Sequence, residues 1–187
     1  MAQPLLLEIP ERLETARLMM RVPRAGDGPI VTASVRESLA QLKPWMPWAK
    51  DDYGEKDGEE WCRRSAANFL NRSILNYTLW LPSGEHIGNV GAFDFDWNVP
   101  RGEIGYWLHT RHCGQGLMTE AVQGLARMLF DQLQFERVEI RMNDLNAGSW
   151  RVAERAGFQL EGTLRRDFRY PDGRLRDTRV YSRVAGA

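Results

Sequence analysis

The sequence is poor in the residues that build disulfide frameworks and metal sites. It has two cysteines, Cys62 and Cys113, and three histidines, and their spacing matches no common metal-binding motif. No apolar run approaches the ~20 residues of a membrane-spanning helix, and Glu8 and Pro10 interrupt the short apolar run that a signal peptide would continue. We therefore expect no bound metal, no membrane partner and a cytoplasmic protein.

An excess of charge of either sign is also missing. Lys and Arg total 25, Asp and Glu total 25, and the net charge is zero. Dedicated nucleic-acid-binding proteins usually carry a basic excess, so we expect no nucleic-acid partner. Hydrophobic residues make up 43% and charged residues 27% of the 187 positions, as in an ordinary globular domain. This length predicts a single domain over residues 1–187, with residues 1–12 as a loose N-terminal leader.

The most informative stretch is residues 103–121, EIGYWLHTRHCGQGLMTEA. Aromatic and branched residues up to His109 are typical of a buried strand, and apolar residues recur at helical spacing from Leu117 onward. Between them, Gly114 and Gly116 can adopt positive φ and carry no side chain. A helix that begins here directs free N–H groups and the positive end of its dipole into the loop, which suits a phosphate or pyrophosphate. A tight turn without a ligand is the alternative.

The rest of the chain predicts alternating helices and strands. Helices are expected over residues 31–42, 59–71, 117–130 and 146–156, with Asp27 as a candidate N-cap of the first. Strands are expected over residues 17–22, 76–81, 86–97, 103–109, 135–142, 158–165 and 178–184. In the strand at 103–109, Tyr106 and Trp107 are interpreted as packing residues.

Four motifs in this order resemble the GNAT N-acetyltransferase superfamily. Arg111-x-x-Gly114-x-Gly116 resembles its acyl-CoA pyrophosphate loop, and residues 143–158 (NDLNAGSWRVAERAGF) resemble the segment that follows in that family. Residues 13–18 (LETARL) resemble its opening strand. Residues 44–48 (PWMPW) resemble a stretch of the RimJ/RimL branch, which acetylates the N-termini of ribosomal proteins.

The resemblance implies a fold and an activity. The fold is α+β, an α/β/α three-layer GNAT arrangement whose mixed, mostly antiparallel sheet of about seven strands is split by a V-shaped opening, with about four helices. The activity is direct acetyl transfer from acetyl-CoA to a primary amine, here the α-amine of a protein N-terminus. A small amine (amino acid, polyamine or antibiotic) is the alternative acceptor, and a catalytically silent acyl-CoA-binding sensor is a third hypothesis. Because the family often dimerises, a homodimer is a further expectation.

The resemblance also implies which residues bind the two substrates. Donor binding falls to Leu108, His109, Arg111, His112, Cys113, Gly114, Gln115, Gly116, Leu117, Met118, Asn143 and Asn146. Asn146 has a second interpretation as the N-cap of the following helix. Trp45 and Trp48 are expected to form a wall of the acceptor groove, and a hydrophobic plug of the core is the alternative.

Two residues are candidates for the chemistry. Many family members have a tyrosine acid where this chain has Ala153, so that acid is missing here. Ser149 matches a serine of RimL-like members and is expected to donate to the leaving sulfur, unless it only bonds backbone in its helix. Glu103 is the candidate base, with Asp167 or water as alternatives and a surface pair with Arg101 as the non-catalytic interpretation. An α-amine, with a pKa of about 7.7–8.0, needs only a weak base.

Overall fold

The computed structural model describes residues 3–170 and 172–186, in which one eight-stranded sheet carries the fold. In spatial order, the strands are β1 (Arg12–Glu14), β2 (Met19–Arg21), β3 (Leu75–Trp80), β4 (His86–Asp96), β5 (Arg101–Leu108), β6 (Arg137–Asn143), β8 (Leu175–Val184) and β7 (Gln159–Arg169). The helices are α1 (Gly28–Leu42), α2 (Glu55–Leu70), α3 (Leu117–Asp131) and α4 (Ala147–Arg155). Every predicted helix and strand is present.

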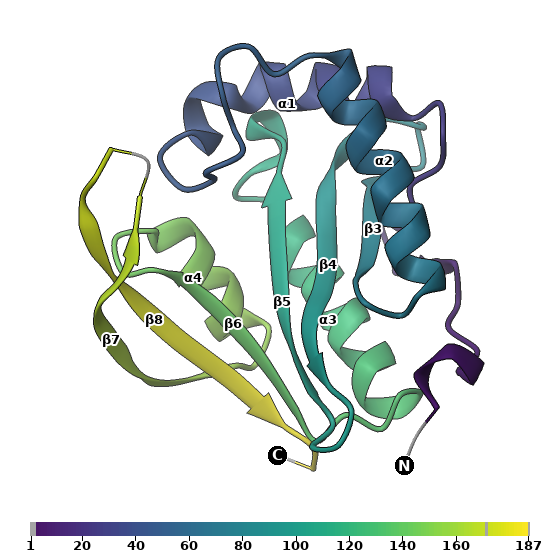
Figure 1. The fold of residues 1–187 in the computed structure, drawn as a ribbon, viewed down its shortest axis with the longest axis vertical. Helices are drawn as coiled ribbons and strands as arrows, with labels where there is room; N and C mark the ends of the chain where they lie inside the picture. Colours follow the sequence, from purple (N-terminus) through teal and green to yellow (C-terminus); the bar gives the residue numbers. More distant parts are fainter. Residues whose placement is uncertain (1–2, 171, 187) are drawn as a thin grey trace.

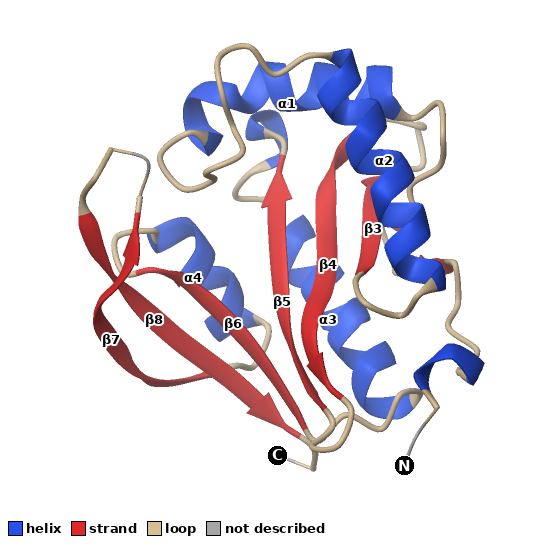
Figure 2. Ribbon diagram, in the orientation of Figure 1, coloured by secondary structure: helices blue, strands red, loops and turns tan. Residues whose placement is uncertain are grey.

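The helices cover both faces of the sheet, which gives three layers (Figures 1 and 2). The pair α1 and α2 lies on one face, and α3 and α4 lie on the other. Apolar residues at helical spacing place Leu117, Ala121, Leu125 and Leu129 of α3 in the core. This arrangement confirms the α+β, three-layer prediction. No helix in the described part of the chain is long and apolar enough to cross a membrane.

The sheet has a seam between β5 and β6 that positions the site. All neighbouring strands pair antiparallel except these two, which run parallel. Their pairing joins residues 101–103 to residues 137–139 and goes no further within the described residues. Beyond it the strands diverge toward the end of the sheet that carries α1 (Figure 1). The predicted V-shaped opening is therefore present.

The structure departs from the sequence expectations near the N-terminus. The eighth strand is β1, which pairs with β2 and was expected only as part of an opening strand. The segment before β1 was expected to be loose, yet Ile9 is buried in the core and the Tyr77 hydroxyl donates to Pro10 O at 2.7 Å. Met1 and Ala2 lie outside the described residues.

Asp27 takes the N-cap position of α1 but does not cap it with its side chain. Its carboxylate instead accepts two hydrogen bonds from Arg21, at 2.7 and 2.8 Å, and one from Arg24 N. A bidentate arginine at this site competes successfully for the carboxylate oxygens because its bonds are charge-assisted.

Candidate active site

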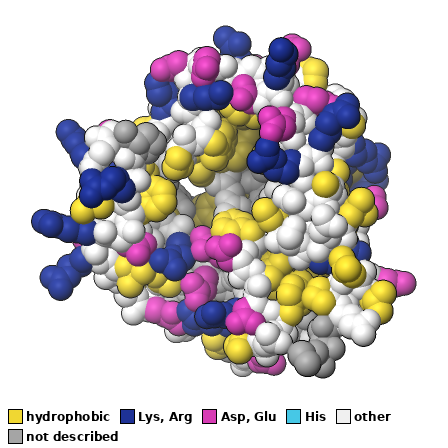
Figure 3. Space-filling model, viewed as in Figure 1, with side chains coloured by type: hydrophobic (Ala, Val, Ile, Leu, Met, Phe, Trp, Pro, Cys, Tyr) yellow, Lys and Arg dark blue, Asp and Glu magenta, His cyan; other side chains and the backbone are white. Residues whose placement is uncertain are grey.

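A cleft of about 700 Å³ opens where β5 and β6 separate. Its walls come from α1, α2 and the segment between them, from β3 to β6, from the start of α4 and from Tyr170. Figure 3 shows the hollow between hydrophobic side chains and the lobe formed by β7 and β8. Six predicted site residues, far apart in the sequence, line this one cleft: Trp45, Trp48, Glu103, Asn143, Asn146 and Ser149.

The cleft reaches both faces of the sheet through the seam. Successive side chains of a strand point to opposite faces. On β5, Trp107 packs with α1 and α2, so Glu103 shares that face, whereas Ile104 and Tyr106 pack on the core at the other face. All four residues line the cleft. A substrate can therefore contact groups from the α1–α2 side and from the α4 side at once.

Glu103 has the electrostatics of a general base. Burial raises the pKa of this half-buried carboxyl from its ordinary 4.5 to about 7, with Arg141 opposing the rise and Asp94 and Glu139 adding to it. No ion pair with Glu103 occurs among the described residues, and Arg101 lies 3.8 Å from Asp96 instead. The non-catalytic interpretation as a pair with Arg101 is therefore not what the structure has.

Ser149 sits in the first turn of α4, held from two sides. The Asn146 side chain caps the helix by accepting a hydrogen bond from Ser149 N at 3.1 Å, which confirms its structural role. The Tyr106 hydroxyl lies 3.1 Å from Ser149 Oγ and donates to Ser149 O at 3.0 Å. Ala153, where the family often has a tyrosine, is fully buried.

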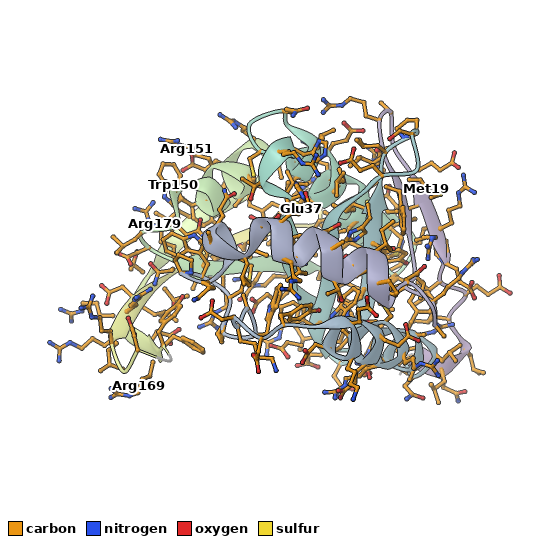
Figure 4. All side chains as sticks on the ribbon, turned by 90° about the horizontal axis from the view of Figure 1, so that it is seen from above. Met19, Glu37, Trp150, Arg151, Arg169 and Arg179 are labelled. Atoms are coloured by element: carbon orange, nitrogen blue, oxygen red, sulfur yellow. The ribbon has the colours of Figure 1, made fainter. Side chains whose placement is uncertain are left out.

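The Trp150 ring next to Ser149 helps to fix α4 on the sheet. The guanidinium of Arg179, on β8, lies 5.1 Å from the ring centre and that of Arg151 lies 5.2 Å from it. Figure 4 shows these three side chains gathered at one end of the molecule.

Asn143 carries a buried donor with no partner. Its Oδ1 accepts from Leu145 N at 2.9 Å, but within the described residues its Nδ2 has no hydrogen bond, although the residue is only 5% exposed. Leaving a buried amide donor unpaired costs about 1–3 kcal/mol. An unpaired donor on the wall of a cleft indicates that an acceptor atom of a bound ligand forms the missing hydrogen bond.

The loop that leads into α3 has free backbone donors. Gly114 and Gly116 have φ of +78° and +77°, the left-handed conformation that favours glycine. Within the described residues, no hydrogen bond engages the backbone N–H groups of residues 114–119. Oxygen atoms of a phosphate are the natural partners of such a row at the N-terminus of a helix.

The side chains of this loop are mostly committed to protein contacts. Arg111 pairs with Glu37 of α1 at 2.5 Å, so the cation that the sequence predicts for the pyrophosphate has a partner already. His112 Nε2 lies 3.0 Å from Glu85 Oε1, and His109 is buried. The side chains of Leu117 and Met118 belong to the core. The side chains named here therefore contact other parts of the protein, whereas the backbone N–H groups of residues 114–119 have no partner within the described residues.

The segment with Trp45 and Trp48 lines the cleft rather than plugging the core. Trp48 is 40% exposed, and its ring centre lies 5.9 Å from that of Tyr53 and 6.3 Å from that of Trp107. The aromatic wall therefore faces the opening on the α1–α2 side.

Known proteins share this organisation. The acetyltransferase (GNAT) domain matches residues 17–159. The chain belongs to the GNAT acetyltransferase family. Its curated relatives include YjcK of Bacillus subtilis (strain 168), which is 44% identical over 64 residues, and YdaF of the same organism, which is 28% identical over 171 residues. The Escherichia coli K12 ribosomal-protein-serine acetyltransferase is 35% identical over 98 residues.

These relatives are matched over different shares of their length. The alignments cover 34% of this chain and 35% of YjcK, 51% of this chain and 54% of the E. coli enzyme, and 88% of this chain and 90% of YdaF. The chain thus spans about one third of the length of YjcK, about half of the E. coli enzyme and most of YdaF.

Solved structures of two acetyltransferases have the same fold. RimL, a ribosomal L7/L12 α-N-protein acetyltransferase solved with coenzyme A, matches with a TM-score of 0.86 at 22% identity, over 93% of this chain and 98% of RimL. MccE, a microcin C7 self-immunity acetyltransferase solved with acetyl-CoA and AMP, matches with a TM-score of 0.86 at 22% identity, over 91% of this chain and 93% of MccE.

Two residues near the site escaped the sequence analysis. Tyr106 was interpreted as packing, but its hydroxyl contacts Ser149 on the cleft wall. Thr119, in the first turn of α3, has a buried Oγ1 without a hydrogen-bond partner in the described part of the chain. A hydroxyl residue just after the glycine loop was the only sequence signal for Thr119, and Tyr106 had none.

Proposed function

We propose that the chain is an acetyl-CoA-dependent N-acetyltransferase whose acceptor is the α-amine of a protein N-terminus. The observation that carries the proposal is the cleft at the seam, where a carboxylate with a raised pKa and a serine hydroxyl in contact with Tyr106 line one cavity. The GNAT family membership supports acetyl transfer, and the E. coli relative, which is named for a ribosomal-protein acceptor, supports the N-terminal acceptor.

The donor fits the groups that the fold leaves open. The free N–H row of residues 114–119 suits the pyrophosphate, with no side-chain cation required. The pantetheine arm follows the unpaired edge of β5 beyond Glu103, where its amides replace the missing strand. The Asn143 Nδ2 donates to one of its carbonyl groups.

The acceptor enters from the α1–α2 side, along Trp45 and Trp48, and meets Glu103. The amine reacts as the free base, and Glu103, whose pKa of about 7 leaves much of it ionised at neutral pH, takes directly or through water the proton that the nitrogen loses after its attack. The amine nitrogen attacks the thioester carbonyl carbon, the C–S bond breaks, and its electron pair goes to sulfur. Ser149 donates a hydrogen bond to that sulfur, and holding both substrates in one cleft supplies much of the rate.

Release of free thiol from acetyl-CoA tests this proposal with three acceptor pools. The pools are short peptides with free N-termini, the same peptides with acetylated N-termini and an internal lysine, and small amines. We expect release with the first pool only, and mass spectrometry of the product locates the acetyl group on the N-terminal nitrogen.

The other outcomes separate the alternatives. Release with small amines alone would replace the protein acceptor by a metabolite or antibiotic. Release with the blocked peptides would move the acceptor to the lysine side chain. Bound acetyl-CoA without release in any pool would favour the sensor.

A further inference from the structure

The phenol of Tyr106 makes an unusual contact across the seam. Tyr106 projects from β5 toward α4, where its hydroxyl donates to the backbone oxygen of Ser149 and lies 3.1 Å from the Ser149 hydroxyl oxygen. No other residue in the described part of the chain hydrogen-bonds the Ser149 hydroxyl. The contact lies beyond Glu103, where the pairing of β5 with β6 has ended and the two strands have diverged.

The contact orients a group that would otherwise rotate. A serine hydroxyl has one proton and two acceptor lone pairs, and it turns freely about its Cβ–Oγ bond unless a partner fixes it. Asn146 fixes the backbone of Ser149, whereas among the described residues Tyr106 alone contacts the hydroxyl. Burial raises the pKa of Tyr106 to about 12, although the bond with Ser149 opposes the rise, so the phenol keeps its proton at neutral pH.

We propose that Tyr106 is a positioning residue that holds the Ser149 hydroxyl as a hydrogen-bond donor toward the sulfur of the acetyl donor. The inference rests on the proposed function, and it concerns the donor rather than the acceptor. When the donor is bound, the phenol proton turns from the Ser149 carbonyl to Oγ, and the Ser149 proton points to the sulfur. As the C–S bond breaks, its electron pair becomes the thiolate lone pair that accepts this hydrogen bond.

No proton needs to leave Tyr106 or Ser149 in this step. A thiolate with a conjugate-acid pKa of about 8.5 is too weak a base to deprotonate serine. The hydrogen bond therefore stabilises the thiolate, the amine proton goes to Glu103, and the thiol is protonated afterwards from solvent. Tyr106 thus acts from β5 on the same leaving group for which many family members use a tyrosine at the position of the buried Ala153.

A double-mutant cycle tests the inference. The variants are Tyr106→Phe, Ser149→Ala and both together, assayed with whichever amine the wild-type protein acetylates, because the effect on the donor does not depend on the acceptor. We expect Tyr106→Phe to lower kcat about 2- to 10-fold, the usual range for one neutral hydrogen bond, with the KM for acetyl-CoA within about twofold of wild type. In the Ser149→Ala background, the tyrosine substitution should change kcat by less than about twofold.

Tyr77→Phe is the matched control. It also removes a buried phenol hydroxyl that bonds a backbone carbonyl, at Pro10, but it lies outside the cleft, so kcat should stay at the wild-type level. A wild-type kcat for Tyr106→Phe beside an impaired Ser149→Ala would overturn the inference alone, as would effects that multiply in the double variant. An unimpaired Ser149→Ala would overturn the role of Ser149 in the proposed function, and the role of Tyr106 with it.

Discussion

Replacing Glu103 by glutamine should lower the catalytic rate and raise the stability of the folded protein. The carboxyl has a pKa of about 7 in the folded protein against an ordinary 4.5. General-base catalysis typically contributes about 10²- to 10⁴-fold, so kcat/KM at pH 8 should fall by roughly that factor in Glu103→Gln. Glutamine keeps the shape of the side chain and replaces one carboxylate oxygen by an amide group that does not titrate.

The pH profile distinguishes a lost base from lost packing. In the wild type, log(kcat/KM) should fall below pH 7 with a slope that approaches two per pH unit. The reason is that both the α-amine, with a pKa of about 7.7–8.0, and Glu103 become protonated. In Glu103→Gln only the amine titrates. At pH 6 about one tenth of Glu103 is ionised, so the ratio of wild-type to variant kcat/KM should drop about fivefold from pH 7 to pH 6 and tenfold per further unit. A ratio that stays constant between pH 5.5 and 8.5 would refute the assignment.

Stability should change the other way. Because the folded-state pKa of Glu103 is raised, ionisation of the carboxyl destabilises the folded protein once the pH exceeds the unfolded value of about 4.5, and the cost is complete above pH 7. Each pH unit in this window is worth about 1.4 kcal/mol, so the full cost is about 3 kcal/mol. Urea denaturation should find Glu103→Gln more stable than the wild type by up to about 3 kcal/mol at pH 8 and equal to it near pH 4. Equal stability at both pH values would show that burial does not act on this carboxyl.

Three further substitutions test the donor site. Asn143→Ala should raise the KM for acetyl-CoA up to about tenfold with little change in kcat, since it removes one neutral hydrogen bond from a buried donor; steady-state kinetics check this. Gly116→Ala should cost about 1 kcal/mol in urea denaturation, because an alanine at φ +77° is strained, and should weaken acetyl-CoA binding in calorimetry. Arg111→Ala should leave the KM for acetyl-CoA within about threefold of wild type, because its guanidinium is paired with Glu37; a larger rise would restore Arg111 to the pyrophosphate site.

Hydrophobic periodicity sufficed to predict the order and type of the four helices and of all strands except β1, because the chain alternates apolar and polar residues at the spacing that each element requires. The resemblance of four motifs supplied the V-shaped opening and the residues that line the cleft. Neither the periodicity nor the resemblance predicts ion pairs between residues that are far apart in the sequence. The partner of Arg111 lies 74 positions away on another helix, and nothing in the local sequence of either residue indicates the pair.

Tyr106 illustrates a second kind of failure. Strand alternation puts it on the same face as Ile104, which is a core residue, so packing was the natural interpretation. Its hydroxyl meets Ser149 of α4, which lies 43 positions away in the sequence. A strand pattern indicates which face a side chain lies on, but it does not indicate which distant residue its hydroxyl will meet.

Because the seam between β5 and β6 is short, the rigidity of the protein depends on whether a substrate lies between these strands. Three residue pairs join the half-sheet β1–β5 to the half-sheet β6–β8, and the remaining edge of β5 has no strand on that side within the described residues. An elongated substrate in the gap would form hydrogen bonds with the free edge of β5 and would hold the two half-sheets together. The backbone amides along the gap should then exchange with solvent quickly in the empty protein and slowly in the loaded one, so that the substrate serves as a removable ninth strand.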